Sequence, residues 1–330
     1  MAGAQLHAAL CRRAVDAPLT AFSLTRELEI AVITTIETRL LRGKAPSQQL
    51  NEEIDLSRAK LALAGGRPPR LATVLVGTNA AAEAYRSSIV RTFARVKLPH
   101  QAVELPATTT TDHLVEILNQ LNRDPQITGI LVLMPLPGHL DPHFVLEHLS
   151  PLKDVDGITP TNAGRLHLGL PSLRPSTPQG GLELLDHYRI ELEGARVTVI
   201  GRSNVVGRPL ATLLTQRHAT VTLCHRRTKD LAAAVRGAEI VCVAAGHAGL
   251  ITGDMLTPGA TLIDFGVNVV GEQIVGDVSL DSVTGIAGAV TPVPGGTGPV
   301  TTLVLARNTI AAGFAALGGN LDHVEYAEPS

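Results

Sequence analysis

The sequence predicts an α/β protein in which helices cover parallel sheets on both faces. Short apolar stretches with little polar alternation recur along the chain, for example LATVLVG at 71–77 and ITGILVLMP at 127–135. Segments with apolar residues at helical spacing separate them. A strand without polar alternation is buried on both faces, which is typical of a parallel sheet between two helical layers. A glycine turn that leads from one such strand directly into a helix points to the same class.

The composition suits a folded protein with small-molecule partners. A chain of 330 residues is long enough for two domains, and 45% hydrophobic with 18% charged residues is ordinary for a globular protein. The 28 basic and 30 acidic residues give a net charge of -2. This balance provides no positive surface for nucleic acid or an anionic membrane, so we expect neither as a partner.

Cysteine usage and hydropathy favour a cytoplasmic protein. Cys11, Cys224 and Cys242 lack the spacing of metal ligands and are typical of reduced intracellular thiols. No apolar run approaches the ~18 residues that span a bilayer, and no secretory signal pattern is evident. The histidines show no metal-ligand spacing either. We therefore expect no membrane span and no metal site.

The first part of the chain predicts an α/β domain. Residues 1–37 mix charges of both signs with short apolar patches and are interpreted as an N-terminal extension, since their acidic residues argue against a transit peptide. From there the predicted order is helix 46–63, strand 71–77, helix 80–95, strand 100–105, helix 111–123 and strand 127–135.

Residues 195–214, ARVTVIGRSNVVGRPLATLL, predict a strand, a tight turn and a helix. The apolar run that ends at Ile200 meets a turn bounded by Gly201 and Gly207, and Pro209 begins a segment with helical spacing. Glycines let a backbone approach a pyrophosphate, and a helix N-terminus supplies free N–H groups for it. The glycine spacing differs from G-x-G-x-x-G, so tight packing alone remains an alternative.

The following strand, TVTLC at 220–224, distinguishes between dinucleotides. It ends in His225, Arg226, Arg227 and Thr228, where an NAD site usually has an acidic residue to bind the ribose hydroxyls. Positive charge suits the additional phosphate of NADP instead, and Arg202 adds a further cation in the first turn. The sequence favours NADP, with NAD still possible.

The last part of the chain returns to the first domain. Strands are expected at 239–246 and 260–267, and TPVPGGTGPVTTLVL at 291–305 leads from a rigid loop into a helix at 299–316. We expect this helix to pack on the first domain, with a ligand cleft between the domains. The expected organisation is an extension (1–37), a first α/β domain (38–158 and 299–330) and a Rossmann-like dinucleotide domain (159–298).

Several motifs resemble the methylenetetrahydrofolate dehydrogenase/cyclohydrolase family in order and spacing, across about residues 38–317. GRSNVVGRP and PVPGGTGP are highly specific in combination. The motifs are VLVG at 74–77, a tyrosine helix around Tyr85, PLP at 135–137, KDVDG at 153–157, STPQG at 176–180, GRSNVVGRP at 201–209, IDFGVN at 263–268, GDV at 276–278 and TPVPGGTGPVT at 291–301.

The resemblance implies two domains around a folate cleft, a homodimer, and NADP as cofactor. Asp156 would bind the amino-pyrimidine edge of the pterin, because a carboxylate can accept two parallel N–H bonds. Tyr85 and Asp156 are the residues implied at the reacting folate. The implied folate-binding residues are Tyr85, Leu133, Asp156, Pro294, Gly295 and Gly296, and the implied NADP-binding residues are Gly201, Arg202, Ser203, His225, Arg226, Arg227, Thr228 and Val267.

Two positions depart from the pattern of members with both activities. Ile89 stands where the family's Tyr-x-x-x-Lys motif has lysine, and Leu133 stands where the family has glutamine. Hydride transfer depends on alignment and needs no side-chain base, whereas attack of water on the methenyl carbon needs proton transfer and electrostatic support.

We therefore expect an NADP-dependent methylenetetrahydrofolate dehydrogenase with weak or absent cyclohydrolase activity. The alternatives are a paralogue that acts on another one-carbon adduct and a non-catalytic folate- or nucleotide-binding protein. The stretch GTNAAAEAY, which lacks the usual Asp and Ser before the tyrosine, supports the first alternative.

Overall fold

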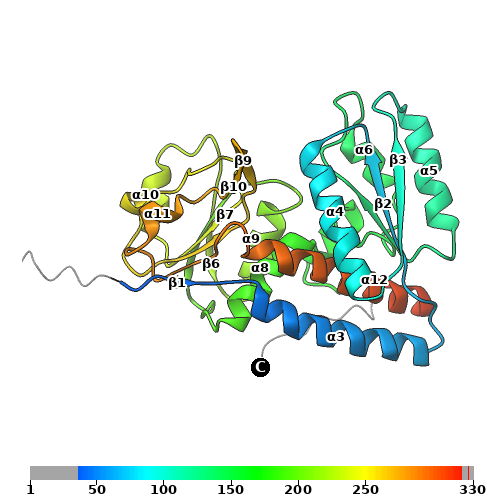
Figure 1. Ribbon diagram of the computed structural model, residues 1–330, viewed down its shortest axis with the longest axis horizontal. Helices are drawn as coiled ribbons and strands as arrows, with labels where there is room; N and C mark the ends of the chain where they lie inside the picture. Colours follow the sequence, from blue (N-terminus) through cyan, green and yellow to red (C-terminus); the bar gives the residue numbers. More distant parts are fainter. Residues whose placement is uncertain (1–35, 322–325, 327–330) are drawn as a thin grey trace, which may run out of the picture. The chain divides into compact units, whose positions relative to one another are not determined.

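The computed structural model describes residues 36–321 and residue 326, so nearly all of the expected extension lies outside the described residues. The predicted α/β class with parallel sheets is confirmed. The described chain contains a three-stranded parallel sheet, a six-stranded parallel sheet and a small antiparallel hairpin. These parts and their connecting helices are shown in Figure 1.

The three-stranded sheet has the order β3-β2-β4 and is covered on both faces. Leu71 and Leu75 of β2 belong to one buried cluster, together with residues of α4 and α12. Val74 and Val76 of the same strand belong to another, together with residues of α5 and α6. This alternation confirms the double coverage expected from the apolar strands. The elements are β2 (Leu71–Val76), α4 (Ala80–Arg95), β3 (His100–Leu105), α5 (Thr111–Arg123), β4 (Gly129–Val132) and α6 (Pro142–Glu147).

The six-stranded sheet has the order β1-β11-β8-β7-β5-β6, and the predicted glycine turn follows the end of β5. Val199 packs with residues of α7, α8 and α9, and Ile200 packs on the opposite face with residues of α10 and α11. The elements are α7 (Pro160–His167), α8 (Ser176–His187), β5 (Arg196–Ile200), α9 (Gly207–Gln216), β6 (Thr220–Cys224), α10 (Leu231–Arg236), β7 (Ile240–Val243), η1 (Gly253–Met255), β8 (Thr261–Asp264), α11 (Leu280–Val283) and β11 (Ala289–Val290).

Two short features near this sheet were not expected, an edge strand and a separate hairpin. The edge strand β1 (Arg39–Leu40) pairs with β11, although the sequence places it at the start of the other domain. The strands β9 (Asn268–Val270) and β10 (Gln273–Val275) form a separate antiparallel hairpin after β8. Val269 and Ile274 of this hairpin are both exposed.

The long helices α3 (Lys44–Leu63) and α12 (Thr297–Gly318) run side by side, and α12 also packs against α4, β4 and α8 (Figure 1). The predicted last helix thus begins two residues earlier than expected. It is also long and apolar enough to cross a membrane, unlike the sequence-based expectation, but 67% of its most apolar window is buried inside the protein. Arg307 lies in the middle of α12 and forms ion pairs with Glu53 and Glu183. This burial and these ion pairs are typical of a helix in a protein core.

Candidate active site

Asp156 is buried beside Ser176 and Tyr85. Asp156 lies two residues after Asp154, which forms an isolated β-bridge with Ile130 of β4. Ser176 is the first residue of α8, and Tyr85 lies on α4. Ser176 donates both its backbone N–H (3.0 Å) and its hydroxyl (2.5 Å) to Asp156 Oδ1. Within the described residues, Asp156 Oδ2 accepts no hydrogen bond. One carboxylate oxygen is fixed, and the other remains available to a ligand.

Burial changes the pKa values of Asp156 and Tyr85. It raises the pKa of Asp156 to about 6, although the two bonds from Ser176 oppose the change. Burial and the neighbouring Asp156 carboxylate also raise the pKa of Tyr85, with the Ser176 hydroxyl acting in the opposite direction. Near neutral pH Asp156 is therefore a carboxylate and Tyr85 a neutral phenol. The structure brings together these two predicted residues.

The two departures from the family pattern lie in one apolar environment. Ile89 is 0% exposed and Leu133 is 2% exposed, and both belong to the buried cluster against which Tyr85 packs. Neighbouring cations are engaged elsewhere: Arg86 pairs with Glu104 at 2.6 Å, and Lys153 donates to the carbonyls of Leu121 (2.9 Å) and Asp124 (2.7 Å). Neither replaces an ammonium group beside Tyr85.

The turn after β5 exposes backbone donors. Gly201 adopts φ +116, and a Cβ there would collide with the carbonyl of Ala244, so the position requires glycine. Ser203 Oγ accepts from the N–H groups of Val206 (3.1 Å) and Gly207 (3.4 Å) and closes the turn at the start of α9. In the described chain, the backbone N–H groups of residues 202–205 donate to no other group. Such free donors before a helix fit a phosphate group.

A second basic turn lies beside the first. Ile200 and Cys224 are partners in the register of the parallel strands β5 and β6, so the turns that follow them are adjacent. Thr228 Oγ1 accepts from the N–H of His225 (2.9 Å) and stabilises the second turn. Within the part of the chain that the structure describes, the guanidinium groups of three exposed arginines have no ion-pair partner: Arg202, Arg226 and Arg227. This arrangement suits a ligand with more than one phosphate.

Two buried aspartates hold the neighbouring loops, and sequence analysis did not assign them. Asp277 accepts from the N–H groups of Ala245 (2.7 Å), Gly246 (2.8 Å) and His247 (2.8 Å), after β7. Asp264 accepts from Gly266 and Val278, and burial raises its pKa to about 6. Val267 is 71% exposed on the segment between them. The motifs IDFGVN and GDV were the available signal for these aspartates.

The loop that contains Pro294, Gly295 and Gly296 packs against the start of α3 and the end of β8. Gly295 adopts φ +102, and its carbonyl accepts from the N–H of Gly43 (2.9 Å). Thr297, the first residue of α12, donates its hydroxyl to the carbonyl of Asp264 (3.2 Å). This loop is therefore fixed beside the strand that leads to Val267.

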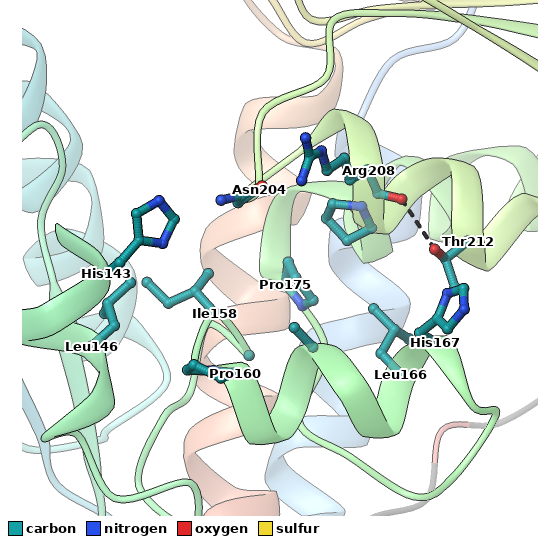
Figure 2. A pocket seen from close by; sticks show the side chains of 13 residues that line it. His143, Leu146, Ile158, Pro160, Leu166, His167, Pro175, Asn204, Arg208 and Thr212 are labelled. Atoms are coloured by element: carbon teal, nitrogen blue, oxygen red, sulfur yellow. Dashed lines mark hydrogen bonds between the residues drawn. The ribbon is translucent and has the colours of Figure 1, made fainter.

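A cavity of about 320 Å³ lies between α7 and α9 (Figure 2). Leu146, Ile158 and Leu166 provide apolar walls, and His143 and Arg208 are polar residues of its lining. None of the predicted site residues lines it, but its lining includes Gly157 and Asn204, which directly follow Asp156 and Ser203, and Pro175, which directly precedes Ser176. Among the described residues, no group of three or more His, Cys, Asp or Glu side chains could hold a metal ion.

Ser176 is the principal residue beside Asp156 that sequence analysis missed. The motif STPQG was quoted for the resemblance, but no role was assigned to its serine. Its function depends on α8, which was not predicted, and which places the serine beside Asp156 although they are 20 residues apart.

Comparisons with known proteins agree with this arrangement. The family model described as the tetrahydrofolate dehydrogenase/cyclohydrolase catalytic domain matches residues 41–156, and the NAD(P)-binding domain of the same family matches residues 175–316. The bifunctional protein FolD of Herpetosiphon aurantiacus is 48% identical over 274 residues, which cover 83% of this chain and 96% of the relative. The FolD of Chloroflexus aurantiacus is 48% identical over 284 residues, covering 86% and 100%.

Solved structures show the same relationship. The bifunctional FolD of Campylobacter jejuni has a TM-score of 0.81 and 40% identity, and the match covers 84% of this chain and 99% of that one. The Trypanosoma brucei enzyme, crystallised with NADP cofactor and an inhibitor, has a TM-score of 0.81 and 35% identity, covering 85% and 99%. The resemblance inferred from the motifs is confirmed: the chain belongs to the tetrahydrofolate dehydrogenase/cyclohydrolase family.

Proposed function

We propose that this protein oxidises methylenetetrahydrofolate to methenyltetrahydrofolate with NADP and hydrolyses the product weakly or not at all. The observation that carries the proposal is the burial of Ile89 and Leu133 in the apolar cluster beside Tyr85, where bifunctional members have lysine and glutamine. The family relationship supports the dehydrogenase. The local environment of Tyr85 argues against the second reaction.

On the folate side, Asp156 is proposed to bind the pterin. Its free Oδ2 has two lone pairs that can accept N–H bonds from the amino-pyrimidine edge, while Oδ1 already accepts two bonds from Ser176. Ser176 holds the carboxylate plane and leaves the outer oxygen open. Tyr85, a neutral phenol beside this carboxylate, forms the neighbouring wall together with Leu133.

On the nucleotide side, the free N–H groups after Gly201 are proposed to bind the pyrophosphate, together with Arg202 and Ser203. Arg226 and Arg227 are proposed to bind the additional phosphate that distinguishes NADP from NAD, between His225 and Thr228. Val267 and the loop 294–296 are proposed to border the nicotinamide and the folate. When bound, NADP supplies the hydride acceptor.

The two reactions differ in what they require from Tyr85 and its neighbours. Oxidation produces a cation that the folate nitrogens stabilise, so the protein mainly aligns the two reactants. Hydrolysis requires a proton to leave the attacking water, and loss of general acid–base assistance typically reduces a rate by about 10²–10⁴. The apolar side chains of Ile89 and Leu133 provide neither a base nor a charge. Only the first reaction is expected to persist.

The experiment that tests the proposal measures formation of NADPH from methylenetetrahydrofolate and NADP, with NAD in a parallel assay. The wild-type protein should reduce NADP in preference to NAD. Asp156→Ala should lose about 10²-fold or more in kcat/KM for the folate, because a charge-assisted contact is removed. Asp112→Ala, at an exposed position of α5, is the control and should retain activity.

The alternative functions give different results in the same experiment. Folate binding without reduction of either nucleotide would indicate a non-catalytic binding protein. Absence of both folate binding and turnover would indicate a paralogue for another one-carbon adduct. Unchanged turnover in Asp156→Ala would remove the proposed pterin contact.

The β9–β10 hairpin supports a homodimer. Val269, Val270 and Ile274 are 76%, 55% and 49% exposed, an apolar surface on an element that could pair with a second copy. We expect the wild-type protein to be dimeric in light scattering and the double variant Val269→Asp/Ile274→Asp to be monomeric. Leu63→Asp, at an exposed leucine on α3, should remain dimeric. A monomeric wild-type protein would contradict this assignment.

The remaining proposals concern domain limits and location. We propose that residues 38–158 and 299–330 form the folate domain, that 159–298 form the NADP domain, and that 1–37 are an extension. A cytoplasmic location is consistent with the free buried thiols Cys224 and Cys242.

A further inference from the structure

Tyr326 is the last residue that the structure describes, and it lies beyond residue 316, where the match to the family model ends. Its half-buried ring packs against the main core cluster, and the guanidinium carbons of Arg174 and Arg307 lie 4.5 Å and 5.3 Å from the centre of the ring. Neither the family resemblance nor the proposed site explains why a tyrosine occupies this place.

The Tyr326 hydroxyl completes a buried hydrogen-bond network. It accepts from the backbone N–H of Arg174 (3.0 Å) and donates to Asn308 Oδ1 (2.8 Å). Burial raises the pKa of Tyr326, which keeps the hydroxyl protonated and able to donate. The hydroxyl thus accepts from Arg174 and satisfies Asn308 Oδ1, which has no other partner within the described residues.

Asn308 connects this hydroxyl to the folate side. It is 0% exposed on α12, and its Nδ2 donates to the carbonyls of Val155 (2.8 Å) and Arg174 (2.8 Å). Because both carbonyls are acceptors, the Asn308 amide must turn its nitrogen towards them. Its Oδ1 then faces the opposite way and needs a donor there. Tyr326 provides that donor, and thereby fixes the orientation in which Asn308 can hold both segments.

The two segments held by Asn308 carry the folate-side pair. Val155 directly precedes Asp156, and Arg174 lies two residues before Ser176, the residue that donates twice to Asp156. The Asn308 side chain therefore links the two backbones whose relative position determines the geometry of that pair. A change in the orientation of Asn308 would shift one segment against the other.

We propose that Tyr326 is a positioning residue for folate binding, acting through Asn308 on Asp156 and Ser176. This inference rests on the proposed role of Asp156. Removal of the hydroxyl leaves the buried Asn308 Oδ1 without its donor, and the Asn308 side chain relaxes to recover one, which shifts the two segments that it holds.

The test is Tyr326→Phe, which keeps the ring beside the two arginines and removes only the hydroxyl. We expect KM for methylenetetrahydrofolate to rise about tenfold, with kcat nearly unchanged and KM for NADP unchanged. Tetrahydrofolate titrated into the variant by calorimetry should bind correspondingly more weakly. The effect is specific to one substrate, which a general loss of stability would not produce.

Tyr188→Phe is the matched control. The Tyr188 hydroxyl donates to the carbonyl of Arg42 (2.8 Å) and its ring also packs on an arginine, Arg39, at 4.7 Å. It has no bond to Asn308 or to the segments around Asp156. Like Tyr326→Phe, this variant loses one hydroxyl hydrogen bond and should be slightly less stable than the wild-type protein. Its KM for the folate should be normal.

Asp156→Asn separates failure of this inference from failure of the proposed function. If Asp156→Asn weakens folate binding and Tyr326→Phe does not, Tyr326 has no positioning role. If Asp156→Asn leaves folate binding intact, the pterin contact itself is wrong, and the inference fails with it. An equal rise in KM for the folate and for NADP in Tyr326→Phe would also overturn the proposal.

Discussion

The turns after β5 and β6, proposed for the nucleotide, and the buried residues around Asp156, proposed for the folate, differ in what they offer a ligand. After β5 and β6, free backbone N–H groups and the exposed guanidinium groups of Arg202, Arg226 and Arg227 surround a turn that only glycine can form at Gly201. The folate side keeps a single open carboxylate oxygen on Asp156, and the surface beside Tyr85 is hydrocarbon. Binding groups are present in both regions, whereas the two side chains beside Tyr85 that depart from the family pattern, Ile89 and Leu133, carry no polar group. On the proposed function, this protein binds both ligands and transfers the hydride but does not catalyse the hydrolysis.

The largest effect is expected from restoring the missing polar pair. Ile89→Lys combined with Leu133→Gln should raise the rate of methenyltetrahydrofolate hydrolysis by about 10²–10⁴, because it returns general acid–base and electrostatic assistance beside Tyr85. The rate is measured by loss of methenyltetrahydrofolate absorbance above the buffer rate.

Val90→Lys is the control for this gain, because Val90 is the next residue on α4 and is 41% exposed. It adds the same charge outside the buried cluster and should leave hydrolysis unchanged. A folded double variant with no gain would show that the contrast between the two regions does not depend on these side chains.

A smaller effect is expected on the nucleotide side. Arg226→Ala combined with Arg227→Ala should raise KM for NADP about tenfold and leave KM for NAD unchanged, since exposed charge-assisted bonds to one phosphate are lost. Arg236→Ala, an exposed arginine at the end of α10, serves as the comparison and should have normal kinetics. Equal weakening of both nucleotides would contradict the assignment of these arginines to the NADP phosphate.

The kcat/KM for the folate should depend on the protonation of Asp156. Because the pKa of Asp156 is about 6, its carboxylate is protonated as the pH falls below that value and can no longer accept two N–H bonds. We expect kcat/KM for the folate to fall about tenfold for each pH unit below 6. Folate binding by Asp156→Asn should lack this dependence. A wild-type affinity for folate that is constant from pH 5 to 8 would disagree with this account.

The smallest effect concerns stability. A carboxyl group with a raised pKa in the folded protein binds its proton more tightly there than in the unfolded chain, so stability falls as the pH rises from about 4 to about 6. At pH 7 the full cost of the buried charge is present. Asp156→Asn should therefore raise the free energy of unfolding by about 1–3 kcal/mol while folate turnover is lost.

Urea unfolding measures this change, with Asp112→Asn as an exposed control that should differ from wild type by less than about 0.5 kcal/mol. A lower free energy of unfolding for Asp156→Asn at pH 7 would contradict this prediction. It would show that the buried carboxylate stabilises the folded protein.

The sequence predicted those features that depend on local chemistry. Apolar strands predicted the double-covered sheets, and glycines with β-branched residues predicted the turn between β5 and α9, both confirmed. The short helices α7 and α8 were not predicted, because α8 contains Pro178 and two glycines and is stabilised by packing on α12. Ser176, Asn308 and Tyr326 were missed because their partners are distant in sequence, up to 153 residues away for Asn308 and Val155.

The assay that tests the central claim most directly follows methenyltetrahydrofolate after NADP has been consumed. Methylenetetrahydrofolate is supplied in excess over NADP, and absorbance of the methenyl product is then recorded beside a sample without enzyme. The account predicts rapid formation of NADPH and a methenyl product that decays at the buffer rate. Enzyme-dependent loss of that absorbance would contradict it, and would show that hydrolysis proceeds beside Tyr85 without the lysine and glutamine.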